Sequence, residues 1–423
     1  MKYLTVLILL ISTNIFAQET YLHCGKLIDV KKEQMLTEMT IIVEDELIKS
    51  VEKGFVKVSA SAELIDLSDK TVMPGLFDMH VHLEGQTSKS AYMEKFTRNE
   101  ADIAFESTLY AEATLMAGFT SVRDLGGTGV NTSLRNAIDK GWIAGPKIYS
   151  CGKAIATTGG HADPSNGYKS YLMGDPGPSE GVVNGTADAR KAVRQRYKNG
   201  ADVIKITATG GVLSVAKNGQ NPQFFEDELK AIVETANDYG MLTAAHAHGD
   251  EGMQRAIKAG IKTIEHGTLM SEETMELMKK YDTYYVPTIT AGKSVAELAE
   301  VPGYYPELVV PKAREIGPKI QSTFAKAYKK GVKIAFGTDA GVFKHGENGK
   351  EFGYMVEVGM PPLEAIKCAT IVPARLLRVD ALYGSIEAGK MADIVAVDAD
   401  PTKNIETMES VSFVMKSGKI YKE

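Results

Sequence analysis

The stretch VIKITATGG, residues 203–211, places a lysine inside a run of residues typical of a buried β-strand. Its neighbours Val203, Ile204 and Ile206 are apolar and β-branched, which favours a strand. A buried ammonium group loses its hydration, so Lys205 needs either an outward direction with a carboxylate partner or a change in its charge. The remaining sequence distinguishes these two alternatives.

Seven other runs resemble this one, and amphipathic helical patterns separate most of them. The eight expected strands lie at residues 76–83, 120–127, 147–155, 202–211, 242–249, 262–268, 283–290 and 333–341. A helix is expected at residues 226–240, where apolar residues recur at the spacing of one helix face. Eight strand-then-helix units predict an α/β fold, specifically a (β/α)8 TIM barrel over residues 73–383.

The two ends of the sequence have a different pattern from its centre. Residues 19–72 and 384–423 contain short alternating runs without helical periodicity, and we expect them to pair into one small β-sandwich domain. Residues 1–18 have one lysine, an apolar run and then small or polar residues, which is typical of a secretory signal peptide. The apolar run is shorter than the ~20 residues that span a bilayer, which favours a cleaved signal over a membrane anchor.

The composition indicates which classes of partner the protein binds and in which cellular compartment it lies. The chain has 423 residues, a formal net charge of -6 and no Lys/Arg run of the kind that binds nucleic acid. Its three cysteines lie far apart and form neither a disulfide framework nor a metal-binding pattern. We therefore expect a secreted protein of a bacterial periplasm, with no nucleic-acid partner, no membrane association after signal cleavage, and a small-molecule or dipeptide substrate. A homo-oligomer is compatible with the sequence.

Polar residues follow the expected strands at the ends where barrel active sites lie. The candidates are His80 and His82 after the first strand, Lys205 in the fourth, His246 and His248 after the fifth, His266 after the sixth, and Asp339 after the eighth. Because the strand alternation has period two, His80 and His82 point to the same side, an arrangement suited to a metal ion. Taken singly, each residue has a structural alternative: His246 or His266 as a buried core histidine, Asp339 as a helix N-cap. Their joint placement favours a common site.

Several motifs together indicate a family. In order, PGLFDMHVHL (74–83), VIKITATGG, AAHAHG (244–249), TIEHGT (263–268) and FGTDAG (336–341) resemble the amidohydrolase superfamily of metal-dependent hydrolases. The stretch GSIEAGKMADIVAVDADP (384–401) is similar to the segment that completes the small β domain of that family. The surroundings of His161 and Asp339 resemble an imidazolonepropionase-like branch that includes binuclear Xaa-Pro dipeptidases and carboxypeptidases.

The resemblance implies a centre with two divalent metal ions, for which zinc is the first expectation. His80, His82 and Asp339 would hold one ion, and His246 and His266 the other. Lys205 would be N6-carboxylated, and its carbamate would bridge both ions together with a hydroxide. This chemistry would turn the buried ammonium into a partnered anion.

The resemblance also implies roles for residues around the metals. Asp339 would take the proton of the attacking water and pass it to the leaving amine. The expected contributions of the other residues are a hydrogen bond to the substrate carbonyl oxygen (His161), substrate contacts (His248 and His345) and internal support of the site (an Arg123–Asp124 pair).

The expected reaction is hydrolysis of an amide bond that releases a C-terminal residue, from Xaa-Pro or a similar dipeptide. Alternatives are a cyclic amide or lactone hydrolase, an imidazolonepropionase-like enzyme or a deaminase. An alternative of another class is a non-catalytic periplasmic binding protein. The partner of the substrate carboxylate stays open, with Lys217, Lys344 and Lys350 as candidates.

Overall fold

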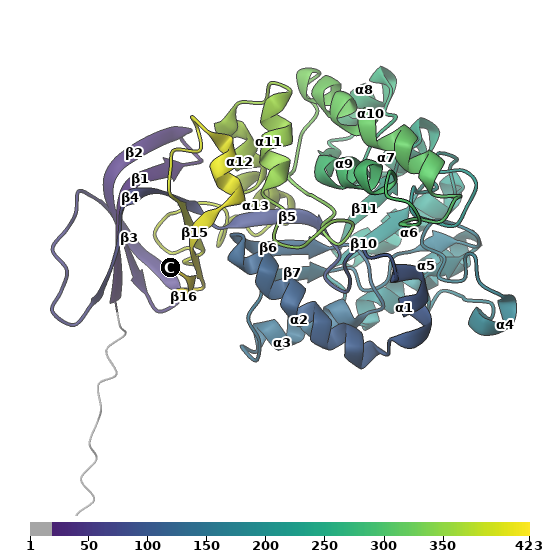
Figure 1. The fold of residues 1–423 in the computed structure, drawn as a ribbon, viewed down its shortest axis with the longest axis horizontal. Helices are drawn as coiled ribbons and strands as arrows, with labels where there is room; N and C mark the ends of the chain where they lie inside the picture. The colour runs from purple at the N-terminus through teal and green to yellow at the C-terminus, as the bar shows by residue number, and fades with distance from the viewer. Residues whose placement is uncertain (1–18) are drawn as a thin grey trace, which may run out of the picture.

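The computed structural model describes residues 19–423, so the expected signal peptide at residues 1–18 lies outside the described part. Parallel strands and their surrounding helices form one region, and strands from both ends of the chain form a sheet beside it (Figure 1). This mixed α/β organisation agrees with the expectation from sequence. Among residues 19–423, no helix has the length and apolar character needed to cross a membrane.

The central strands are short, buried and parallel. They lie in a three-stranded sheet, β5 (Leu76–Val81), β6 (Phe119–Asp124) and β7 (Lys147–Ser150), and a four-stranded sheet, β10 (Val203–Thr207), β11 (Leu242–Ala247), β12 (Thr263–His266) and β13 (Tyr284–Val286). A two-stranded sheet of β8 (Ala156–Thr157) and β9 (Val182–Val183) accompanies them. Burial of nearly every residue is expected for parallel strands covered on both faces.

Backbone hydrogen bonds link strands at the edges of the two larger sheets to segments outside these sheets. On one side, Ile155 N donates to Lys205 O at 2.8 Å, and Thr207 N donates to Ile155 O at 3.0 Å. On the other side, residues 333–340 lie between β13 and β5: Ala335 N donates to Tyr285 O and Met79 N donates to Phe336 O, both at 2.9 Å.

The eighth expected strand, residues 333–341, forms only isolated bridges instead of a regular strand. Asp339 has a left-handed backbone with φ 62°, which is incompatible with continued strand geometry. The segment therefore keeps the expected position between its neighbours but not the expected regularity.

Helices follow most of the central strands. Their bounds are α1 (Ala91–Thr97), α2 (Glu100–Met116), α3 (Val130–Asp139), α4 (Ser170–Met173), α5 (Gly185–Lys198), α6 (Glu226–Asp238), α7 (Asp250–Ala259), α8 (Glu272–Lys280), α9 (Ile289–Leu298), α10 (Val310–Lys329), α11 (Lys350–Glu357), α12 (Pro362–Cys368) and α13 (Ile371–Leu376). The helix expected at residues 226–240 is α6. Its apolar face, including Leu229, Ile232 and Ala236, is buried against the strands.

The chain ends form one seven-stranded sheet. Its order is β16 (Lys419–Lys422), β15 (Val411–Lys416), β14 (Ile394–Val397), β4 (Glu63–Pro74), β1 (Glu19–Asp29), β2 (Gln34–Glu44) and β3 (Leu47–Lys53), and a 3-10 helix, η1 (Ile405–Glu409), precedes β15. The antiparallel pairing of β4 with β14 unites the two ends, as expected. Leu47 also bridges Met391, so the sheet curls back on itself around its own apolar core. The expected domain boundaries, between residues 72 and 73 and between residues 383 and 384, stay predictions.

Candidate metal-dependent active site

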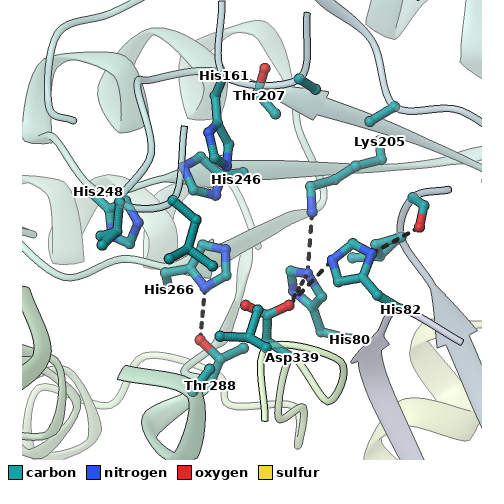
Figure 2. Close-up of a pocket in the computed structure, with 18 of the residues that line it drawn as sticks. His80, His82, His161, Lys205, Thr207, His246, His248, His266, Thr288 and Asp339 are labelled. Atoms are coloured by element: carbon teal, nitrogen blue, oxygen red, sulfur yellow. Dashed lines mark hydrogen bonds and ion pairs between the residues drawn. The ribbon is translucent and has the colours of Figure 1, made fainter. Parts of the chain in front are cut away.

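A cavity of about 420 Å³ opens at the carboxyl ends of the parallel strands. Figure 2 shows the predicted polar residues pointing toward one another in this cavity. Eight of the nine predicted site residues line it, namely His80, His82, His161, Lys205, His246, His248, His266 and Asp339. They come from segments up to 259 residues apart in sequence, and the parallel arrangement of the strands brings them together.

His80, His266 and Asp339 form the tightest group of possible metal ligands. One donor atom from each lies within 4.8 Å of the others, and all three residues are buried. Asp339 Oδ1 makes no hydrogen bond and lies 3.2 Å from His82 Nε2 and 3.5 Å from His80 Nε2. A buried carboxylate oxygen without a hydrogen-bond donor, surrounded by imidazole nitrogens, is a donor set that fits a divalent cation such as zinc.

Lys205 points inward from the middle of β10. Only 4% of the residue is exposed, and its Nζ lies 3.3 Å from His80 Nε2 (Figure 2). Burial lowers the pKa of its ammonium group because the protein interior solvates a charge less well than water. The alternative of an outward lysine in a surface salt bridge does not agree with this position.

An ion pair beneath the cavity fixes the orientation of His80. His80 Nδ1 lies 3.0 Å from Glu265 Oε2, and Arg123 Nη2 donates to Glu265 Oε1 at 2.8 Å. A carboxylate on Nδ1 leaves Nε2 free to face the cavity.

The expected Arg123–Asp124 pair was wrong, because successive residues of a strand point to opposite faces. Arg123 joins Glu265 instead, while Asp124 accepts hydrogen bonds from Leu83 N at 2.9 Å and Asn131 Nδ2 at 2.8 Å. Both side chains are internal, as expected, but they support the site separately.

Three consecutive strand ends have left-handed backbones: His266 with φ 69°, Thr288 with φ 53° and Asp339 with φ 62°. Asp and His tolerate this conformation better than a β-branched residue, so Thr288 carries the greatest strain. Thr288 Oγ1 lies 2.7 Å from His266 Nδ1 and so orients the ring. The buried Glu351 carboxylate accepts from the next two backbone amides, at Ile289 and Thr290, which anchors the strained turn.

His246 lies beside the tight group rather than within it. Its Nε2 donates to Gly210 O at 3.0 Å, and its ring centroid lies 4.6 Å from that of His266 and 4.3 Å from that of His161. His161 Nδ1 is buried without a hydrogen-bond partner. Gly211 leaves room for this ring, since a Cβ there would lie 2.1 Å from His161 Cε1.

Burial keeps most of these imidazoles neutral. It lowers the pKa of His161 to about 3 and that of His248, which also faces the charge of Lys312, to about 4. The pKa values of His80, His246 and His266 fall well below their ordinary range, again mainly because of burial. Neutral imidazole is the form that coordinates a metal ion.

His345 is the predicted site residue that does not line the cavity. It is buried, stacks on Tyr110 with ring centroids 4.7 Å apart, and its Nε2 lies 2.9 Å from Gly85 O. This position corrects the expected substrate contact. The three lysines proposed for the substrate carboxylate, Lys217, Lys344 and Lys350, do not line the cavity either, whereas Lys153 does.

Comparisons with known proteins agree with this geometry. The Amidohydrolase family model matches residues 71–421. A crystal structure of a Xaa-Pro dipeptidase with methionine bound in the active site is 52% identical, with a TM-score of 0.93, over 96% of this chain and 100% of that one. A prolidase structure complexed with N-methylphosphonate-L-proline is 32% identical, with a TM-score of 0.88, over 96% of this chain and 100% of that one. Ochratoxinase of Aspergillus niger is 32% identical over 440 residues, which cover 98% of this chain and 89% of that protein.

Proposed function

Because the chain belongs to the amidohydrolase family and is a hydrolase acting on C–N bonds, we propose that it is a metal-dependent dipeptidase that cleaves Xaa-Pro. The observation that carries the proposal is the convergence of Lys205 with His80, His266 and Asp339 in one buried cavity. The 52% identity to a Xaa-Pro dipeptidase supports proline as the released residue.

The proposal includes a closed (β/α)8 barrel with a β-sandwich domain made from both chain ends. The hydrogen bonds of Ile155 with β10, and of residues 333–340 with β13 and β5, support closure at both sheet edges. The curled seven-stranded sheet with its own core supports the second domain. Enzymes with such barrels carry their active sites at the carboxyl ends of the strands, where this cavity lies.

In the proposed centre, His80, His82 and Asp339 would hold one divalent ion, with zinc as first choice. His246 and His266 would hold the second, and a carboxylated Lys205 would supply a ligand to both. The lowered pKa of Lys205 supports carboxylation, because only a neutral amine attacks carbon dioxide. When bound, the ions would supply Lewis acidity and a hydroxide nucleophile at neutral pH.

The remaining roles belong to side chains of the protein. Asp339, whose Oδ1 has no hydrogen-bond donor, would accept the proton of the attacking water and transfer it to the amide nitrogen that leaves. His161, neutral and with Nδ1 unpartnered, would donate to the carbonyl oxygen as it gains negative charge. His248, which also lines the cavity, would contact the substrate.

We propose further that residues 1–18 direct the chain to a bacterial periplasm. The support is the charged, apolar and then polar order of these residues. Edman sequencing of the protein recovered from the periplasm is expected to begin near residue 18 or 19. Recovery of the intact N-terminus from the cytoplasm alone would contradict this location.

The test of function is amino-acid release by the protein purified with zinc and bicarbonate. We expect release of proline from Xaa-Pro and none from the same dipeptide with its peptide bond replaced by a methyleneamine. An Asp339→Asn variant purified in the same way serves as the control for contaminating peptidases. A protein with two bound metal ions per chain that releases no proline would refute the dipeptidase proposal, and cyclic amides and lactones would be assayed next.

A further inference from the structure

The cavity has two unlike sides. One side carries the histidines, Lys205 and Asp339, together with an ion pair between Lys153 and Glu180 at residues that follow β7 and precede β9. The other side is apolar and comes mainly from α9 and α10. We call this surface the apolar wall and define it by Val212, Ala291, Val295, Ala313, Ile316 and Ile320.

A close approach of two helices fixes the position of the apolar wall. A Cβ at Gly317 in α10 would lie 2.5 Å from the Cβ of Ala296 and 2.6 Å from the carbonyl oxygen of Gly292, both in α9. A Cβ at Gly292 would in turn lie 2.6 Å from Ile320 Cγ2. The two glycines let the helices pack at short range, so the depth of the wall is set by backbone contacts rather than by mobile side chains.

Lys312 lies beside the wall but does not line the cavity. Lys312 in α10 donates to the carbonyl oxygens of Gly211, Ser214 and Ala216 at 3.1, 2.6 and 2.9 Å. These three bonds use all the protons of the ammonium group. They also hold the loop that carries Val212, so Lys312 stabilises the wall without adding a charge to its surface.

The wall lies next to the reacting centre. Helix α9 begins directly after Thr288, which lines the cavity and contacts His266. Ala291 and Val295 line the same cavity as His266 and Asp339, so a substrate held at the strand ends shares this cavity with the apolar wall. Apolar surface left facing water is unfavourable, and an apolar substrate group would cover it.

We infer that the apolar wall binds a large apolar side chain of Xaa, so that Leu-Pro, Met-Pro and Phe-Pro are preferred over Gly-Pro and Ala-Pro. This inference rests on the proposed function, which fixes proline as the released residue and leaves Xaa as the variable one. An apolar pocket distinguishes two substrates that differ by one methylene or a comparable group by about 10- to 200-fold in kcat/KM. We expect kcat/KM for Leu-Pro to exceed that for Gly-Pro by at least about tenfold.

The experiment compares the Leu-Pro to Gly-Pro ratio of kcat/KM in the wild type and in two matched variants. Val295 and Val309 belong to the same buried cluster, with 6% and 0% exposure, but Val295 lines the cavity and Val309 does not. Val295→Ala is expected to lower the ratio about three- to tenfold, on the scale of apolar discrimination above. Val309→Ala, which removes the same atoms, is expected to leave it unchanged. Ala291→Leu, which fills the wall, should lower the ratio of Phe-Pro to Gly-Pro and serves if Val295→Ala fails to fold.

The outcomes separate the two proposals. If the protein cleaves no Xaa-Pro substrate, the proposed function fails. If it cleaves Leu-Pro, Gly-Pro and Lys-Pro with similar kcat/KM, the dipeptidase function stands and the apolar subsite is refuted. An equal fall of the ratio in Val295→Ala and Val309→Ala would also refute it, because the effect would then come from the general loss of packing.

Discussion

The two sides of the cavity are built from opposite kinds of residue. The metal-ligand side concentrates buried imidazoles, an inward lysine, a carboxylate oxygen without a donor and left-handed backbone at three strand ends. The apolar wall comes mainly from α9 and α10, which pack closely at Gly292 and Gly317. The metal-ligand side lowers the stability of the fold, because buried polar groups and strained backbone are unfavourable, and it provides the reactive groups. The apolar wall stabilises the fold by packing and also shapes the cavity. Substitutions on the two sides should therefore differ in which property they change.

The sharpest contrast is between Asp339→Asn and Val309→Ala. Asp339→Asn is expected to lower kcat/KM about 10³-fold, in the range for loss of a general base, and to lower the melting temperature of the metal-free protein less than Val309→Ala does. Val309→Ala should destabilise the fold by about 1–3 kcal/mol through a cavity and keep most of the activity. Steady-state kinetics and thermal unfolding of both variants measure the difference. A loss of stability in Asp339→Asn equal to that of Val309→Ala would remove the contrast.

Lys205→Ala is expected to have the next largest effect. Without the carbamate, the protein should bind less metal and lose at least about 10²-fold in activity, given how much bound metal contributes to hydrolysis. Elemental analysis measures the metal content, and native mass spectrometry of the wild type should detect one added CO2. A Lys205→Ala protein that keeps both ions and full activity would refute the bridging role.

Glu265→Gln tests the support beneath the metal-ligand side. Gln lacks the charge that pairs with Arg123 and orients His80, so metal affinity should fall about 10- to 100-fold. Competition with a chelator measures the affinity. Glu276→Gln, on the exposed face of α8, is the control and should leave the affinity unchanged. Equal affinities of wild type and Glu265→Gln would show that His80 needs no such partner.

Acidification should destabilise the metal-free protein through the buried histidines. The folded-state pKa values of His161, about 3, and His248, about 4, lie below the ordinary value of 6.5. Between the folded-state pKa values and 6.5, the unfolded state binds more protons than the folded state. The contribution of these histidines to the free energy of unfolding is therefore complete above pH 6.5 and is lost as the pH falls toward 4. Thermal unfolding of chelator-treated protein between pH 7 and 5 measures this slope. His161→Gln should make the slope shallower, and an unchanged slope would contradict the contribution of His161.

The smallest effect is expected for Thr288→Ser. Serine keeps the hydroxyl that orients His266 and removes the branch that the left-handed backbone disfavours. We expect a gain of about 0.5–1 kcal/mol in stability, a fraction of the usual strain, with activity within about threefold of the wild type. Thr288→Val keeps the branch but loses the hydroxyl, and it should lower metal affinity instead. Equal metal affinity of the two variants would contradict the orienting role of the hydroxyl.

The sequence predicted the residues whose positions follow from strand alternation and order. His80 and His82 point to one side because they are two residues apart, and Lys205, His266 and Asp339 converge because parallel strands end at one face. Partners chosen by tertiary packing could not be predicted: Glu265 meets Arg123 from 142 residues away, and no local pattern distinguishes it. His345 was misassigned because closeness to Asp339 in sequence does not determine side-chain direction, and its ring packs on Tyr110. The left-handed backbone of Thr288 could not be predicted from the sequence either, since threonine normally favours extended backbone.

The pairing of β4 with β14 has a consequence for how the chain is made. Residues 63–74 meet residues 394–397, so the first four strands are translated long before their partner exists. Until then, the β4 edge lacks this neighbour, and such an edge is a template for wrong pairing with other chains. The partners of most parallel strands follow closely along the sequence. These strands can therefore associate before the seven-stranded sheet is complete. The end of the chain therefore acts as the closing step of folding, and substitutions in β14 to β16 are expected to reduce the yield of folded protein more than its activity once folded.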